Sequence, residues 1–247
     1  MKRKDFLHLT GICSIGLFTI PHLALGAVQD RFTIAQLIGK VNPEIIGNSY
    51  RQKMHKQTKA AFLEMKAAAA KDNISIEVVS AYRSFERQKE IFEGKYKRFT
   101  GQGLSPKQAL SKIIEYSTIP GTSRHHWGTD IDIIQANTGA RPSSVLQEKH
   151  FYGNGQFCDM KVWLTQNANS YGFYEVYTKD ENRKGFSHEP WHFSYKPISK
   201  PMLMAYKKLD VKSILQQEKI MGSEHFNDGF IAKYVQEHIL DINPELL

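Results

Sequence analysis

The sequence has few cysteines and contains neither a low-complexity tract nor an internal repeat. Its two cysteines are Cys13, inside an apolar N-terminal stretch, and Cys158. If that stretch is removed on export, a single thiol is left, so an internal disulfide is excluded and stability has to come from a hydrophobic core. At 247 residues, of which 41% are hydrophobic, the chain is long enough to build one.

The N-terminus has the three parts of an export signal. Met1–Lys4 is positively charged, Phe6–Leu25 is mostly apolar, and Ala24–Ala27 offers small residues for cleavage. A transmembrane anchor is the alternative, but two glycines and a proline interrupt the apolar stretch, which favours cleavage over a span. Residues 1–27 are therefore predicted to be a signal peptide that leaves no membrane span. The destination is the periplasm or cell envelope, by the Sec route or, because Arg3-Lys4 is similar to a twin-arginine pair, by the twin-arginine route.

The chain has an excess of positive charge. Its formal charge of +8 loses three cations and one carboxylate with residues 1–27, which leaves +6. A moderately basic exported protein suits an anionic polymer such as the cell wall, or a membrane surface. Because the chain is exported, no nucleic-acid partner is expected.

Hydrophobic periodicity and capping residues predict an α+β fold. Helices are expected at 51–73, from Ser84 to Lys95, from Ser105 to Tyr116 and at 157–171, and strands at 74–79, 129–134, 174–178 and 191–195. The order of the elements indicates a small antiparallel sheet flanked by helices. Residues 28–200 are the predicted domain, and 201–247 a helical C-terminal extension packed on it.

Two aspartates share one face of the strand predicted at 129–134. Side chains alternate along a strand, so Ile131 and Ile133 point into the core while Asp130 and Asp132 point to the other side. Neighbouring carboxylates repel each other unless water, a cation or hydrogen-bond donors offset the repulsion. His125 lies in the preceding loop, which can turn its imidazole over the same face. His125 and Asp132 therefore make half of a zinc site, since imidazole and carboxylate are both normal zinc ligands.

The other half is expected in residues 187–194, which read Ser-His-Glu-Pro-Trp-His-Phe-Ser. Alternation along the strand that starts at Trp191 places His192 on the side of the site. Pro190 cannot donate a ladder hydrogen bond and marks the entrance of the strand, so Glu189 lies in irregular chain and can turn toward the metal. Two histidines, one aspartate and an unligated glutamate are the groups that a catalytic zinc hydrolase requires.

These residues carry a resemblance to a known family. The sequence resembles the VanY-type D-alanyl-D-alanine carboxypeptidases, zinc peptidases of the group that includes lysostaphin and the hedgehog signalling domain. Three motifs appear in the family's order over about Val78–Tyr195: Y-R-S followed by a glutamine in Ser80–Gln88, S-x-H-x-x-G-x-A-x-D at Ser123, His125, Gly128 and Asp132, and E-x-W-H at Glu189–His192. The chain departs from the second motif at Asp130, where alanine is usual.

The resemblance implies one Zn²⁺ per chain, with His125, Asp132 and His192 as its ligands and Glu189 as the general base. It also implies that Arg83 binds the substrate. A guanidinium suits that role because it can hold the free carboxylate of a C-terminal D-amino acid through two parallel hydrogen bonds, which lysine does less well.

Four further residues have less specific expectations. Ser123 is expected to bind the substrate or to hold its loop, and Gln88 to line the site or to cap its helix. Asp130 is expected to orient a ligand histidine from behind. His126 is expected to be a bystander to the metal, a loop residue that contacts the substrate.

The function that the resemblance implies is removal of the terminal D-amino acid, of the D-Ala-D-Ala type, from peptidoglycan stem peptides by a zinc enzyme. The chain is expected to be exported and monomeric. Related families act as LD-carboxypeptidases or cleave the internal L-Ala-D-Glu bond, and both activities stay alternatives. A non-catalytic zinc-containing module that binds the cell wall is a third alternative, which Glu189 argues against. A cysteine peptidase acting through Cys158 is the fourth, although a buried structural thiol on a helix is expected there.

Overall fold

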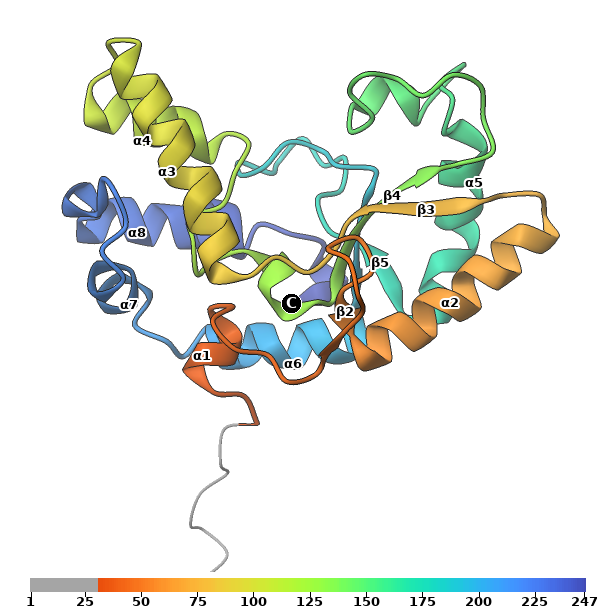
Figure 1. Cartoon of the computed structure of the whole chain (residues 1–247), viewed down its shortest axis with the longest axis horizontal. Helices are drawn as coiled ribbons and strands as arrows, with labels where there is room; N and C mark the ends of the chain where they lie inside the picture. The colour runs from red at the N-terminus through yellow and green to blue at the C-terminus, as the bar shows by residue number, and fades with distance from the viewer. Residues whose placement is uncertain (1–30) are drawn as a thin grey trace, which may run out of the picture. The chain divides into compact units, whose positions relative to one another are not determined.

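A four-stranded antiparallel sheet (Figure 1) carries Asp130, Asp132 and His192. The structure is a computed structural model that describes residues 31–247, so the signal peptide expected at 1–27 lies outside the described residues. The strands lie in the order β3 (Ile76–Ser80), β4 (Asp130–Gln135), β6 (His192–Tyr195) and β5 (Phe173–Glu175). In the register of the two central strands, Asp130 lies opposite Ser194 and Asp132 opposite His192.

One face of this sheet is apolar, as the alternation along β4 predicts. Ile131 and Ile133 of β4 and Phe193 of β6 are buried in one core cluster. Two helices, α2 (Lys56–Lys71) and α5 (Cys158–Asn167), supply the side chains packed with them, among them Phe62, Met65, Ala69, Met160 and Leu164. The polar side chains of β4 and β6 therefore point to the opposite face.

The remaining helices contribute to a second core cluster. They are α1 (Ile34–Leu37), α3 (Phe85–Gly101), α4 (Pro106–Ile114), α6 (Lys196–Tyr206), α7 (Val211–Gln217) and α8 (Asp228–Tyr234). Among them, α3 and α4 run side by side (Figure 1). Trp127 and Tyr177, which lie beside the polar face of the sheet, belong to this second cluster. The polar face of the sheet therefore lies between two apolar cores.

The expected helices and strands are present, but several of their ends differ from the prediction. Helix α3 continues to Gly101 and does not end at Lys95, and strand β5 ends at Glu175 and not at Thr178. Ser84 caps α3, as its residue type predicts, by accepting a hydrogen bond from a main-chain N–H of the first turn. The helix expected from Arg51 begins only at Lys56. The reason is tertiary, because Met54–His55 forms strand β2, which pairs with β1 (Ile45–Ile46).

The C-terminal residues are mainly helical. Helix α6 starts at Lys196 and continues through Pro201, so the domain boundary expected between residues 200 and 201 falls inside a helix. A π-helical turn at Val235–Ile239 follows α8. Within residues 31–247, no helix is both long and apolar enough to cross a bilayer.

Candidate metal centre

A tight turn places His125 beside strand β4. Residues 124–127 form a short 3-10 turn, and Gly128 ends it with φ of 68°, a left-handed conformation that glycine adopts without strain. A side chain would not fit there, since a Cβ on Gly128 would lie 2.7 Å from the main-chain nitrogen of His55. The chain then enters β4 and brings Asp132 to the side of His125.

His125, Asp132 and His192 converge on the polar face of the sheet, and one potential ligand atom of each lies within 4.8 Å of the others. His125 Nδ1 donates a hydrogen bond to Ala81 O at 2.7 Å, so the lone pair is on Nε2, which lies 3.4 Å from Asp132 Oδ2. Burial lowers the pKa of His125 well below its ordinary value. The imidazole is therefore neutral, which is the form that binds a metal.

His192 lies among three carboxylates. Its Nδ1 is 2.9 Å from Glu189 Oε2 and 3.9 Å from Asp132 Oδ1, and its Nε2 is 3.5 Å from Asp130 Oδ2. Burial alone would lower the pKa of His192, but the carboxylates of Asp130 and Glu189 outweigh it and raise the pKa to about 10. A divalent cation bound in the site would replace the proton on this ring as the positive charge that balances the surrounding carboxylates.

Asp132 shows that the site fits a cation. Its Oδ1 is buried and has no hydrogen-bond partner among the residues that the structure describes, and burial raises the pKa of its carboxyl to about 6. A buried oxygen of this kind is costly to leave without a partner. Two imidazoles and one carboxylate form a donor set typical of zinc, with room for a fourth ligand.

Glu189 opens the turn that leads into β6. Its N–H donates to Tyr177 O and its carbonyl accepts from His192 N, both at 3.0 Å, so the chain reverses at Pro190. The side chain of Glu189 is 27% exposed. A carboxylate that contacts a candidate ligand and also reaches solvent is suitably placed to accept a proton from water.

Residues 188–192 also spell H-E-x-x-H, the pattern of helical zinc peptidases. The pattern does not apply here, because this segment is a turn followed by a strand. His188 Nε2 lies 2.7 Å from Tyr152 Oη, and its Nδ1 lies 2.9 Å from Tyr177 O. Both nitrogens are thus engaged by protein groups, and His188 does not belong to the group of converging ligands.

Asp130 is fully buried behind His192. Arg124 donates through Nε to Asp130 Oδ2 at 2.8 Å and through Nη2 to Ser194 Oγ at 2.7 Å. Burial alone would raise the pKa of Asp130, but Arg124 and the hydrogen bond with His192 together outweigh it and hold the pKa below its usual range. A charged carboxylate therefore faces Nε2 of His192, the arrangement in which an outer carboxylate orients a ligand histidine.

Arg83 is held by two neighbours. It donates through Nη1 to Gln88 Oε1 at 2.8 Å and through Nη2 to Ser80 Oγ at 3.2 Å. Gln88 is fully buried in α3 and donates in turn to Thr118 O at 2.7 Å. Arg83 and Ser123 both line the pocket described below, whereas Gln88 lies behind Arg83. Gln88, itself fixed by Thr118, therefore holds the Arg83 guanidinium in its orientation.

The side chain of His126 holds the main chain of Arg83 in place. Its Nδ1 donates to Arg83 O at 2.6 Å, and its Nε2 accepts from Gly121 N at 3.0 Å. Burial lowers the pKa of His126 to about 4, so the ring stays neutral, as this pair of bonds requires. His126 is fully buried and is not among the residues that line the pocket.

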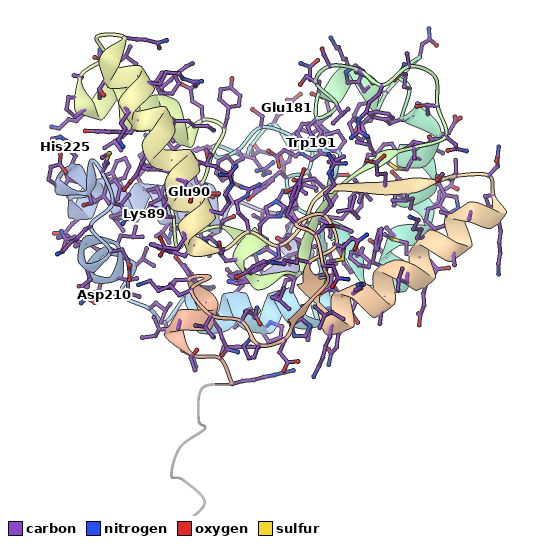
Figure 2. All side chains as sticks on the ribbon, in the orientation of Figure 1. Lys89, Glu90, Glu181, Trp191, Asp210 and His225 are labelled. Atoms are coloured by element: carbon purple, nitrogen blue, oxygen red, sulfur yellow. The ribbon has the colours of Figure 1, made fainter. Side chains whose placement is uncertain are left out.

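A pocket of about 390 Å³ opens over these groups. Besides Arg83, Ser123, the three candidate ligands and Glu189, it is lined by Glu115–Thr118, Arg124, Leu146, Tyr177, Phe186–His188 and Trp191. In the view of Figure 2, Trp191 lies between α3 and α5. Cys158, at the start of α5, is a free thiol outside this lining. Arg124 and Tyr177 are pocket residues that sequence reasoning missed. The position of Arg124 next to His125 is the one sequence feature that could have indicated either of them.

Comparisons with known proteins identify the family. Residues 51–198 match the VanY family, described as D-alanyl-D-alanine carboxypeptidase. The D-alanyl-D-alanine carboxypeptidase of Enterococcus faecalis is 29% identical over 153 residues, and the putative carboxypeptidase YodJ of Bacillus subtilis is 30% identical over 143 residues. These alignments cover 62% and 58% of this chain and 52% and 46% of the relatives. The chain thus spans about half the length of the curated relatives it matches.

Two solved structures are similar in fold. VanYB in complex with D-alanine-D-alanine aligns with a TM-score of 0.51 and 24% identity, covering 73% of this chain and 92% of that one. The LdcB LD-carboxypeptidase aligns with a TM-score of 0.50 and 24% identity, covering 75% and 78%. These likenesses confirm the predicted α+β fold. Because the family match extends over more than half of the sequence, the chain belongs to the VanY family of D-alanyl-D-alanine carboxypeptidases.

Proposed function

We propose that this chain is an exported zinc-dependent carboxypeptidase that removes the terminal D-amino acid, of the D-Ala-D-Ala type, from peptidoglycan stem peptides. The observation that carries the proposal is the convergence of His125, Asp132 and His192 within 4.8 Å, with the Glu189 carboxylate 2.9 Å from one of them. Membership of the VanY family supports it. Cleavage of residues 1–27, one zinc ion per chain and a monomeric state are parts of the same proposal.

The residues divide the chemistry among them. Zinc held by His125, Asp132 and His192 would supply Lewis acidity to a water molecule and to the scissile carbonyl. Glu189 takes a proton from the attacking water and later passes a proton to the leaving amine. Its contact with His192 keeps this carboxylate beside the ligand set during both transfers.

Arg83 supports recognition of a substrate that carries a free carboxylate beside the bond that is cut. Its guanidinium lines the same pocket as the three candidate ligands and matches a free terminal carboxylate in charge and shape. The D-Glu of a stem peptide is linked through its γ-carboxyl and keeps a free α-carboxylate, so the digestion below, and not Arg83, separates an endopeptidase from a carboxypeptidase. A terminal D-amino acid is common to the substrates of DD- and LD-carboxypeptidases, so the LD activity is the main alternative outcome of the experiment below.

Digestion of purified muropeptides tests the proposed bond. The zinc-loaded protein without residues 1–27 is expected to shorten pentapeptide stems by one alanine, read as the product mass in mass spectrometry. A chelator is expected to abolish the reaction and added zinc to restore it. Shortening of tetrapeptides with intact pentapeptides would assign the LD activity instead, and cleavage between L-Ala and D-Glu would contradict a carboxypeptidase.

Replacing Arg83 by glutamine tests recognition of the carboxylate. Loss of the charged hydrogen bonds between the guanidinium and the substrate carboxylate is expected to lower kcat/KM about 10- to 100-fold. The matched control is Arg87→Gln on the exposed side of α3, where Arg87 pairs with Glu90 and little change is expected. A stem peptide with an amidated C-terminus removes the partner of Arg83, so wild type and Arg83→Gln should cleave it at similar rates. An equal loss on both peptides would contradict the assignment.

A further inference from the structure

The residues after the VanY match hold one wall of the pocket. This wall is the segment 117–123, which supplies lining residues next to Arg83. Tyr206 of α6 donates through its hydroxyl to Gly121 O at 2.8 Å. Tyr234 of α8 accepts from Ile119 N at 3.0 Å. Both tyrosines are buried, so these bonds are shielded from competing water.

The same C-terminal residues also hold a second wall of the pocket, the segment 176–189, which supplies the lining residues Tyr177 and Phe186–Glu189. Asp241 Oδ2 accepts hydrogen bonds from Lys184 N at 2.6 Å and from Gly185 N at 2.9 Å. Gly185 packs so tightly there that a Cβ on it would lie 1.5 Å from Glu237 O. Asn243 N donates to Val176 O at 2.9 Å, at the other end of this wall.

Arg183 connects these contacts to Glu189. Its Nε donates to Asp241 O at 3.1 Å and its Nη2 to Phe186 O at 2.9 Å. The guanidinium also lies over the ring of Tyr177, 5.2 Å from its centroid, and Tyr177 O accepts the N–H of Glu189. Asn243 therefore holds the residue before Tyr177, and Asp241 reaches the residue after it through Arg183, which donates to Thr178 O at 3.0 Å.

We propose that residues 199–247 act as a clamp on the pocket, in which Asp241 is a positioning residue for Glu189. The inference rests on the proposed function. Without the Asp241 carboxylate, two main-chain N–H groups of the segment 183–189 lose their acceptor, and the segment opens more readily. A displacement of about 1 Å can cost a catalytic group a factor of about 10². The clamp therefore acts on the rate of the chemical step.

The experiment compares zinc-loaded Asp241→Ala with wild type. We expect kcat to fall about 10-fold with a smaller change in KM, because the base and not the substrate contact is displaced. Hydrogen exchange measured by mass spectrometry is expected to be faster in the peptide that covers 179–189. Asp241→Asn keeps one side-chain oxygen for both N–H groups and should restore kcat to within about twofold of wild type.

Asp210→Ala is the matched control. Asp210 is another aspartate of the C-terminal segment that accepts a main-chain N–H, from Ser213 at 3.0 Å, as the cap of α7, and it lies beyond α3 from Trp191 in Figure 2. Its loss should lower Tm by about 2–4 °C and leave kcat and exchange at 179–189 unchanged. In a Glu189→Gln background, Asp241→Ala should cause no further loss, since residues that act as a unit are not additive.

The clamp is overturned if Asp241→Ala keeps the kcat of wild type, or if its kcat falls no further than that of Asp210→Ala. It is also overturned if Asp241→Ala lowers kcat by the same factor in a protein whose Glu189 is already glutamine. If the wild-type protein hydrolyses no stem peptide, the proposed function fails, and unchanged exchange at 179–189 would then overturn the clamp separately. If Asp241→Ala does not fold, Asn243→Ala removes the bond from Asn243 Nδ2 to Glu175 O, 2.9 Å, and is judged by the same two readouts.

Discussion

Replacing Glu189 by glutamine is expected to lower kcat by about 10²- to 10⁴-fold, the range that general acid–base catalysis contributes. Glutamine keeps the shape of the side chain but cannot accept a proton from water. Glu189 is outside the group of converging ligands, so the variant is expected to bind one zinc ion per chain as wild type does. Steady-state kinetics on a pentapeptide stem and metal analysis of the purified protein measure the two quantities.

Glu181→Gln is the control for this experiment. Glu181 is exposed and lies outside the pocket lining, in the loop that leads toward Glu189 (Figure 2), and the chemical change is the same. Its kcat should equal that of wild type. A Glu189→Gln protein that retains zinc and a kcat within about tenfold of wild type would mean that another group takes the proton.

Much of the candidate site follows from strand periodicity. The alternation along β4 predicts that Asp130 and Asp132 share a face opposite Ile131 and Ile133, and the apolar pair is buried as expected. The proline before β6 predicts irregular chain at Glu189, where the structure has a turn. These features depend on contacts between near neighbours in the sequence, which local patterns describe well.

The parts that could not be predicted depend on tertiary contacts. His188 stands next to Glu189 in the sequence, but its hydrogen bonds with Tyr152 and Tyr177 keep it out of the candidate metal group, and no local pattern indicates them. Arg124 pairs with Asp130 only because the 3-10 turn folds it back over β4. The clamp joins residues more than 50 positions apart, such as Asp241 and Lys184, for which a single sequence carries no signal.

Replacing Asp130 by alanine is expected to have two separable effects. The first is on stability, because the Arg124 guanidinium is about 5% exposed and its Nη1 already has no partner among the described residues. Removing one member of a buried ion pair costs about 3–5 kcal/mol of unfolding free energy, measurable by denaturant titration of the metal-free protein. The second effect is on His192, whose Nε2 loses the carboxylate 3.5 Å away, and zinc affinity is expected to fall about 10- to 100-fold.

The double variant Arg124→Met/Asp130→Ala separates these effects. It removes the unpaired buried charge, and apolar replacements of buried ion pairs are often neutral in stability, so the unfolding free energy should return toward that of wild type. Zinc affinity should stay low, because the carboxylate behind His192 is still missing. If zinc affinity recovers together with stability, Asp130 serves only to neutralise Arg124. If it stays low in a stable protein, the aspartate that departs from the alanine of the family's motif orients the ligand histidine.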